Sequence, residues 1–240
     1  MIRRDYFLRM IEEFTRALAK IIQQKEQHQW REAATSIEAQ ARRLTGEDLA
    51  TLGTLTDTEL LARLLQTGEF QALREKTLML ARVLIEAAET ADAENREGES
   101  ADLRSGTQIG NNLRLKALHL LLKTVLNGDI FEWPEFVPNI DLLLLKFAGA
   151  ELPVQTHALL MQHFERSGQF ARAEDALFAM LESEPEDPSL PQWGISFYRR
   201  MLDQSDSALE AGDLPRGEVQ TGLGQMQERT IDAAGKQAPD

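Results

Sequence analysis

The side chains best suited to acid–base or metal chemistry are few and widely spaced in this sequence. Histidine occurs only at His28, His119, His157 and His163. His157 and His163 are six residues apart, which places them on different faces of one helix. They therefore cannot form the i, i+4 histidine pair that binds zinc on a helix. We expect all four to be ordinary structural histidines.

Carboxylates and glycines do not complete a known site either. The carboxylate clusters at Glu12-Glu13 and from Glu184 to Asp187 lack the spacing of a calcium-binding loop or of a bundle-type Glu-x-x-His site. The glycines between residues 217 and 224 lack the strand, the helix and the Lys-Ser/Thr pair of a nucleotide-binding loop. The chain has no cysteine, which excludes a thiolate nucleophile, a cysteine-ligated metal and a disulfide framework. We predict no catalytic residue, no metal and no cofactor.

Composition and charge narrow the class of protein further. The 240 residues carry 26 Lys/Arg against 39 Asp/Glu, a net charge of −13, which argues against nucleic-acid binding because phosphates require a basic surface. Residues 1–44 alone hold nine Lys/Arg and six Asp/Glu, so a net positive segment precedes an acidic body. No stretch approaches the roughly 20 apolar residues of a membrane span. The charged N-terminus lacks the apolar core of a signal peptide, and we expect a cytoplasmic protein.

The first 46 residues predict a helical hairpin. Apolar residues recur with helical spacing over about residues 3 to 25, and again from Trp30 to Leu44, where Gly46 provides a helix end. The first helix carries a continuous apolar seam of Phe7, Ile11, Phe14, Leu18 and Ile21. An exposed seam would promote association. We therefore expect it to be buried, either against the rest of the chain or against a second copy in a homodimer.

The remaining sequence predicts further helices and no strand. The predicted ranges are 57–68, 70–91, 111–126, 140–148, 153–167, 169–183 and 190–204. From Glu86 to Asp102 there are seven acidic residues and one arginine, which favours a solvated connector after the helix end. Asn111 and Asn112 precede an apolar helix and are expected to cap it. Beyond Gly212 glycines accumulate, and we expect a partly disordered tail with some helix around residues 220–231.

These elements predict an all-α fold of stacked antiparallel helical hairpins. Residues 111–126 and 140–148 are apolar on nearly every face and must be covered on two sides, which favours stacked layers over a simple bundle. We expect an N-terminal hairpin at 1–46, a helical body at 47–211 and a Gly-rich tail at 212–240. The arrangement would be an α-solenoid with irregular repeats.

A tetratricopeptide motif is the sharpest sequence signal. Residues 157–185 match the pattern at the positions His157, Leu160, Met161, Phe164, Ala173, Leu177 and Pro185, with the turn at Gly168. His157 replaces the usual bulky aromatic residue and Met161 the usual small one. The spacing Trp30-x2-Ala33-x3-Ile37 repeats the spacing Phe170-x2-Ala173-x3-Leu177.

The chain also resembles a bacterial family of tetratricopeptide-like proteins of uncharacterised activity. Members open with an Asp-Tyr-x2-Arg-x-Ile-Glu helix, which is present here from Asp5 to Glu12. The resemblance implies a second helix with an aromatic-x2-Ala pattern, found at Trp30 to Ala33, followed by the segment Leu44-Thr45-Gly46. It carries over no catalytic residue.

Taken together, these features predict a non-enzymatic interaction or scaffold protein that binds a protein or peptide in a groove. The candidate partner-binding residues are Asn111, Asn112, Tyr6 and Arg9. Asparagines of this kind present side-chain amides to peptides in some of the repeats that the motif resembles. Two alternatives stay open: an enzyme with a carboxylate-based site on a helical scaffold, and a purely structural, self-associating subunit.

Overall fold

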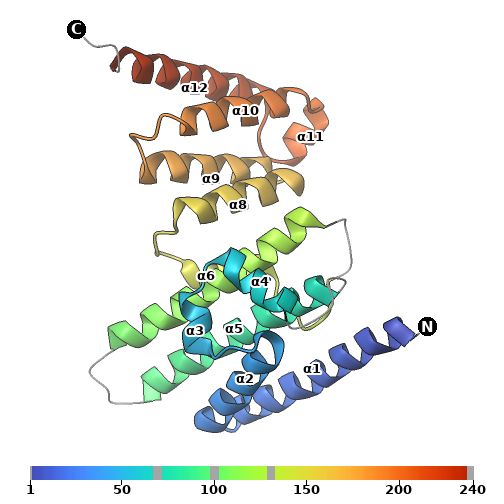
Figure 1. Ribbon diagram of the computed structural model, residues 1–240. Coiled ribbons are helices and arrows are strands. Elements are labelled where there is room, and N and C mark those ends of the chain that lie inside the picture. The colour runs from blue at the N-terminus through green and yellow to red at the C-terminus, as the bar shows by residue number, and fades with distance from the viewer. Residues whose placement is uncertain (1, 67–71, 98–102, 129–132, 237–240) are drawn as a thin grey trace. The chain divides into compact units, whose positions relative to one another are not determined.

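The computed structural model describes residues 2–66, 72–97, 103–128 and 133–236 (Figure 1). Every regular element within these ranges is helical, which confirms the all-α prediction. The chain divides into two units, Met1–Gly149 and Ala150–Asp240. This boundary differs from the expected ones at residues 46 and 211, because the N-terminal hairpin packs against later helices of the first unit.

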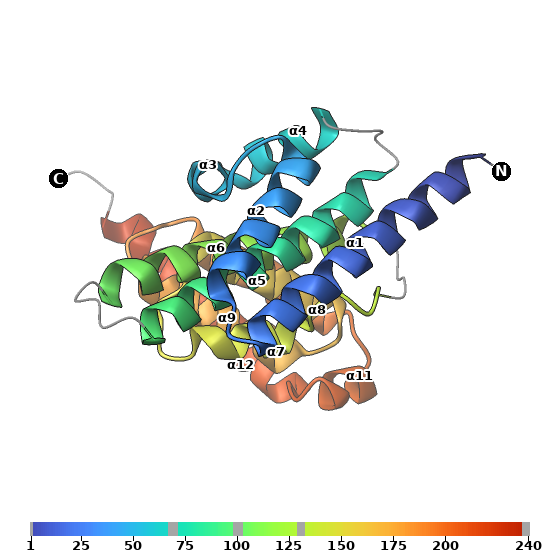
Figure 2. The same ribbon diagram turned by 90° about the horizontal axis from the view of Figure 1, so that it is seen from below.

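The first unit contains two long helical hairpins and several short helices. Its elements are α1 (Ile2–Glu26), α2 (Trp30–Thr45), α3 (Leu49–Thr54), α4 (Asp57–Gln66), α5 (Leu73–Glu97), α6 (Leu103–Asn127), α7 (Ile140–Leu144) and the 3-10 turn η2 (Leu145–Phe147). Helices α5 and α6 pack along each other at its centre, and α2 covers α5 (Figure 2). The short helix α3 falls outside the predicted helix ranges, none of which covers residues 47–56.

The apolar seam of α1 is buried within the chain over its C-terminal half. Phe14, Leu18 and Ile21 are all buried, and the ring of Phe14 packs edge-on against Phe136 with centroids 5.1 Å apart. Ile11 is only half-buried, and the side chain of Phe7 lies outside the described residues. In both views the N-terminal part of α1 extends beyond the helices that it packs against (Figures 1 and 2).

The acidic segment after Glu86 is not a solvated connector as expected. Helix α5 continues to Glu97, and Glu86 is buried with 1% of its side chain exposed. Its carboxylate accepts a hydrogen bond from Lys25 Nζ at 2.5 Å and pairs with Arg82. Glu89 Oε2 lies 2.7 Å from the same Lys25 Nζ. Cations from α1 and α5 therefore neutralise Glu86 and Glu89, which the sequence pattern had placed in solvent.

The second unit consists of α8 (Val154–Arg166), α9 (Phe170–Ser183), α10 (Leu190–Leu202), α11 (Asp206–Ala211) and α12 (Arg216–Lys236). Helices α8 and α9 form a hairpin, and α10 packs against α12. The segment expected to be a Gly-rich tail is therefore mostly helical up to Lys236. Two of its glycines are packing positions: a Cβ atom at Gly222 would overlap the Tyr198 ring, and one at Gly212 would overlap the Phe170 ring.

The turns of the α1–α2 and α8–α9 hairpins have the same backbone geometry. His28 and Gly168 have positive φ angles of 56° and 74°. The following residues, Gln29 and Gln169, have φ and ψ of −88° and 64°, and of −92° and 66°. Each glutamine N–H donates to the carbonyl five residues earlier, at 2.8 and 2.9 Å. The two sequence segments that share the aromatic-x2-Ala spacing thus follow the same kind of helix-ending turn.

Candidate functional site

An apolar pocket of about 490 Å³ opens in the first unit between α2, α3, α5 and α6. Its size falls in the range of ligand-binding pockets, roughly 300 to 1,000 Å³. The lining residues are Ala34, Ile37, Leu49, Ala50, Gly53, Thr54, Ala87, Thr90, Ala91, Glu94, Ile109, Asn112 and Leu113. Small side chains from three of the four helices leave this space unfilled.

The pocket begins where the residues of α5 change in size. From Leu78 to Ile85 the buried positions of this helix are Leu, Met, Val and Ile, with Ala81 the one exception. From Ala87 onward they are alanine and threonine, and the same helix spacing then leaves a cavity. Empty apolar volume costs stability unless something fills it. A run of small residues at one level of the structure is therefore the local cause of the pocket.

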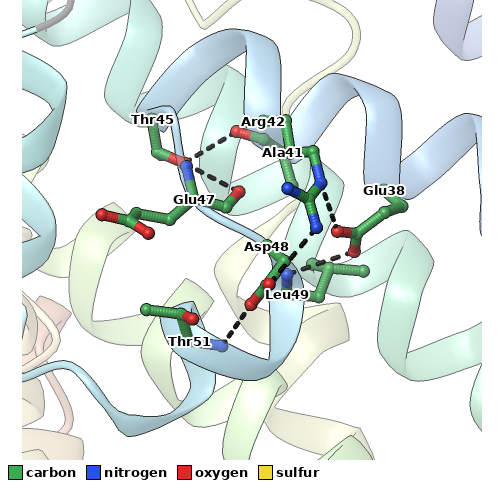
Figure 3. A network of polar contacts seen from close by, with 8 residues as sticks. All are labelled: Glu38, Ala41, Arg42, Thr45, Glu47, Asp48, Leu49 and Thr51. Carbon is green, nitrogen blue, oxygen red and sulfur yellow. Dashed lines mark hydrogen bonds and ion pairs between the residues drawn. The ribbon is translucent and has the colours of Figure 1, made fainter.

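A network of polar contacts fixes α3 against α2 and so holds one wall of the pocket (Figure 3). Glu38 on α2 accepts from Arg42 Nε at 2.9 Å and from the backbone N–H of Leu49 at 3.1 Å. Asp48 accepts from the N–H of Thr51 at 2.8 Å, which caps α3, and lies 3.2 Å from Arg42 Nη2. The hydrogen bond from Thr51 lowers the pKa of Asp48 and keeps the capping carboxylate ionised.

The opposite wall is tied to α3 by Asn112. Its Nδ2 donates a hydrogen bond to the backbone carbonyl of Gly53 at 3.0 Å. Asn112 is itself exposed, and its amide oxygen accepts no hydrogen bond from another described residue. Next to it, Ile109 leaves 57% of its surface in solvent, and Glu94 contributes an exposed carboxylate. The mouth therefore combines apolar surface, an amide and one negative charge.

Thr90 adds an unsatisfied polar group to the lining. The residue is 2% exposed, and its hydroxyl forms no hydrogen bond within the described part of the chain. Threonine in a helix usually donates to the carbonyl four residues earlier, as Thr77 does to Leu73 at 2.7 Å. A buried polar group without a partner costs about 1 to 3 kcal/mol.

The structure separates the predicted partner-binding residues into two groups. Asn111 and Asn112 lie inside α6 rather than at its start, so the expected capping role is wrong: the helix already begins at Leu103. Asn111 accepts from Arg114 Nη1 at 3.2 Å, and only Asn112 lines the pocket. Arg9 is exposed on α1, and the side chain of Tyr6 lies outside the described residues.

The clustered carboxylates and histidines elsewhere do not line this pocket. The largest cluster joins Asp57 Oδ2 to His119 Nδ1 at 2.9 Å and to Lys123 Nζ at 2.8 Å. Burial raises the pKa of Asp57, but the hydrogen bonds from His119 and Lys123 outweigh it and lower the pKa to about 2. The cluster ties α4 to α6. No group of three His, Asp or Glu side chains among the described residues is arranged to hold a metal ion.

A second cavity, of about 750 Å³, belongs to the second unit and is more polar. It is lined by Ala150, Glu151, Leu152, Pro153, Val154, His157, Ala179, Glu182, Ser183 and Glu184. Burial lowers the pKa of His157, which favours the neutral imidazole. The cavity contains carboxylates without an arranged cation or nucleophile, and the pocket of the first unit is the better defined site.

Comparison with known families gives a match over nearly the whole chain. One family model, described as a family of unknown function (DUF6483), matches residues 1–230. The chain belongs to this family. No curated protein and no solved structure matches the chain significantly. Membership of DUF6483 assigns no role to any residue, so the function has to be inferred from the pocket and its surroundings. None of the helices in the described ranges is long and apolar enough to cross a membrane.

Sequence reasoning found Asn112 but missed the rest of the pocket. The signal that could have revealed it is the loss of large residues from Ala87 to Ala93 in a helix that is otherwise rich in Leu and Met. The acidic residues of that segment instead led to the prediction of a solvated connector. Gly53 and Ala50 could not have been added, because the short helix that carries them was not expected.

Proposed function

We propose that this protein is a non-enzymatic interaction protein whose pocket in the first unit receives an apolar side chain of a protein or peptide partner. The observation that carries the proposal is the apolar, half-open pocket beside the exposed Ile109. Exposed apolar surface next to a pocket, rimmed by polar groups, is characteristic of interaction sites. The Asn112 amide oxygen at its mouth can accept a hydrogen bond from a partner backbone.

The tetratricopeptide-like character of the chain belongs to this proposal. The shared turn geometry at His28 and Gly168 supports it, together with full burial of Ala33 and Ala173 at matching positions after each turn. In such repeats the small residue allows two helices to approach closely. The bacterial origin and cytoplasmic location expected from the sequence are part of the same proposal.

The alternatives differ in which groups they require. An enzyme would need titratable groups arranged to act together, whereas the buried carboxylates Asp57 and Glu86 are paired with cations that link helices. The second cavity contains carboxylates and His157, but the carboxylates are not paired with a cation that lines it. A purely structural subunit would not need an open pocket. The enzyme and the structural-subunit alternatives both predict that filling the pocket has no effect on partner binding.

A pocket-filling variant tests the proposal. Gly53 has a helical conformation without positive φ, and nothing lies within 4 Å of a Cβ atom built on it. Gly53→Leu therefore places a side chain at the pocket without forcing the backbone. Gly224→Leu is the matched control, because Gly224 is equally unobstructed but lies on α12 in the second unit.

The measurement is selection of a phage-displayed peptide library on each immobilised protein. We expect peptides with a large apolar residue to be enriched on the wild type and on Gly224→Leu, and to be lost on Gly53→Leu. Equal enrichment on all three proteins, or none on the wild type, would rule out the pocket as a peptide-binding site.

A further inference from the structure

Near its N-terminus, α1 exposes apolar surface at Leu8. Helix α1 has 25 residues and its hairpin partner α2 has 16, so about 14 Å of α1 extends past α2 at 1.5 Å per residue. Within this extension Leu8 is 50% exposed. Ile11, three residues later and on the same face, is only half-buried.

The same extension is positively charged. Arg9 is exposed, and none of the ion pairs among the described residues includes it. Arg3 and Arg4 precede it in the sequence, and residues 1–44 are net positive while the rest of the chain is strongly acidic. Because their net charges are opposite, residues 1–44 and the acidic remainder of the chain attract each other.

The pocket of the first unit has the complementary properties. It is apolar, it exposes Ile109 at its mouth, and its one charged residue is the exposed carboxylate of Glu94. An apolar side chain followed by a cation matches these features. Leu8 and Arg9 provide this pair in adjacent positions.

Helix α1 cannot reach the pocket of its own chain. Lys25 is bound to Glu86 and Glu89, which flank the lining residue Ala87 on α5. Leu8 lies 17 residues earlier in the same continuous helix, about 26 Å away. Glu94 is only eight residues beyond Glu86, about 12 Å along α5. Only α1 of another molecule can place Leu8 in this pocket.

We infer that the pocket is the docking site for the projecting end of α1 from a second copy of this chain, with Leu8 inside it and Arg9 beside Glu94. The inference rests on the proposed function, because it names the partner of the same pocket. It also joins the two groups of partner-binding residues expected from the sequence. Arg9 on α1 and Asn112 on α6 become the two sides of one interface between copies.

Exchanging the charges of Arg9 and Glu94 tests the inference. Self-association of the full chain is measured by sedimentation velocity over a series of concentrations. We expect the wild type to self-associate with micromolar affinity. Arg9→Glu and Glu94→Arg should each weaken the association about tenfold, because each places like charges together. The double variant R9E/E94R should return to within about threefold of the wild type, because the pair is restored with reversed sign. A monomeric wild type, or a double variant weaker than either single one, would overturn the inference.

Engineered cysteines give a second readout that does not depend on affinity. The chain has no native cysteine, so a disulfide can form only between introduced residues. Leu8→Cys in one copy and Ile109→Cys in a tagged copy should cross-link on mixing, because docking brings the two positions within disulfide distance. Leu8→Cys mixed with Gly224→Cys is the control. An equal yield in both mixtures would contradict docking at the pocket.

These outcomes are separable from failure of the proposed function. If the wild type selects peptides through the pocket but sediments as a monomer, the pocket binds a different protein and the second-copy inference alone is wrong. If Gly53→Leu changes neither peptide selection nor self-association, both proposals fail.

Discussion

The amide of Asn112 on α6 donates a hydrogen bond to the backbone carbonyl of Gly53 on α3, with 3.0 Å between Nδ2 and the oxygen. This contact crosses from one wall of the pocket to the other, between residues 59 positions apart in the chain. It satisfies a carbonyl near the end of a six-residue helix, where backbone acceptors lack helical partners. The bond and the α2–α3 polar network together hold α3 in place while the space behind it stays unfilled.

Filling that space should stabilise the protein. Gly53→Leu removes a glycine from a helix, which contributes about 1 kcal/mol, and it buries apolar surface in the pocket, which we expect to add about 1 kcal/mol more. Gly224→Leu should gain only the contribution from removing a glycine from a helix. Thermal unfolding followed by circular dichroism should show a higher midpoint for Gly53→Leu than for the control. A midpoint below that of the wild type would mean that the pocket does not exist in solution.

The glycines of α12 should respond in opposite directions to the same substitution. A Cβ atom at Gly222 would overlap the ring of Tyr198, whereas nothing lies within 4 Å of one at Gly217. We expect Gly222→Ala to destabilise the protein by about 1 to 3 kcal/mol through overpacking. Gly217→Ala should be neutral or stabilising by up to about 1 kcal/mol. Urea unfolding of the two variants measures the difference, and equal effects would mean that α12 does not pack on α10 through Gly222.

The sequence predicted the helices well and their connections poorly. Amphipathic periodicity located α1, α2, α8, α9 and α10 to within two or three residues at each end, because each has one apolar face. It missed the six-residue helices α3 and α11, which are too short to show a period. It predicted only residues 220–231 of α12, since glycine disfavours a helix locally but permits the close approach that Tyr198 requires.

The pocket was hidden from the sequence for a different reason. A cavity depends on how four helices pack against one another, and no local sequence pattern shows this. The prediction of a solvated connector after Glu86 was wrong for a related reason. Whether a carboxylate faces solvent or a cation depends on residues distant in the sequence, such as Lys25. Asn112 was found only because its residue type suggested binding, and the role first expected for it, capping, was wrong.

The buried ion pair between Lys25 and Glu86 should matter more than an exposed pair on the same helix. Lys25→Met keeps the aliphatic stem but leaves Glu86 buried with only Arg82 as a cationic partner. We expect a loss of about 2 to 3 kcal/mol, below the range for a fully unpaired charge because Arg82 remains. Arg16→Ala breaks an exposed pair with Glu12 and should cost less than about 0.5 kcal/mol. Urea unfolding distinguishes them, and a loss for Lys25→Met as small as that for Arg16→Ala would contradict the pairing.

Acid should weaken the first unit through Asp57. Its pKa of about 2 in the folded protein lies below the value of about 3.9 for an unfolded aspartate, so folding favours the ionised form. The resulting stability is present above about pH 4 and is lost as the pH falls toward 2. We expect a loss of about 1 to 2 kcal/mol over this window, discounted for partial hydration of the cluster. Asp57→Asn should be less stable at pH 5 and should lack this share of the pH dependence. An identical acid dependence in the variant and the wild type would show that Asp57 is not paired.

The last prediction concerns the two hairpins that share a turn. Ala33 and Ala173 are both fully buried, and each lies three residues into the helix that follows a turn of the same geometry. If each alanine is the point of close helix approach, a larger side chain must push the helices apart. Ala33→Leu and Ala173→Leu should therefore each destabilise the protein by about 1 to 3 kcal/mol.

Ala19→Leu on α1 provides the control, because Ala19 is exposed and the change should stay within about 0.5 kcal/mol. Thermal and urea unfolding should give similar losses at positions 33 and 173, since the local geometry is the same. A loss at one position and none at the other would mean that the two hairpins share only the shape of their turn, and support for the tetratricopeptide-like proposal would then rest on residues 157–185 alone.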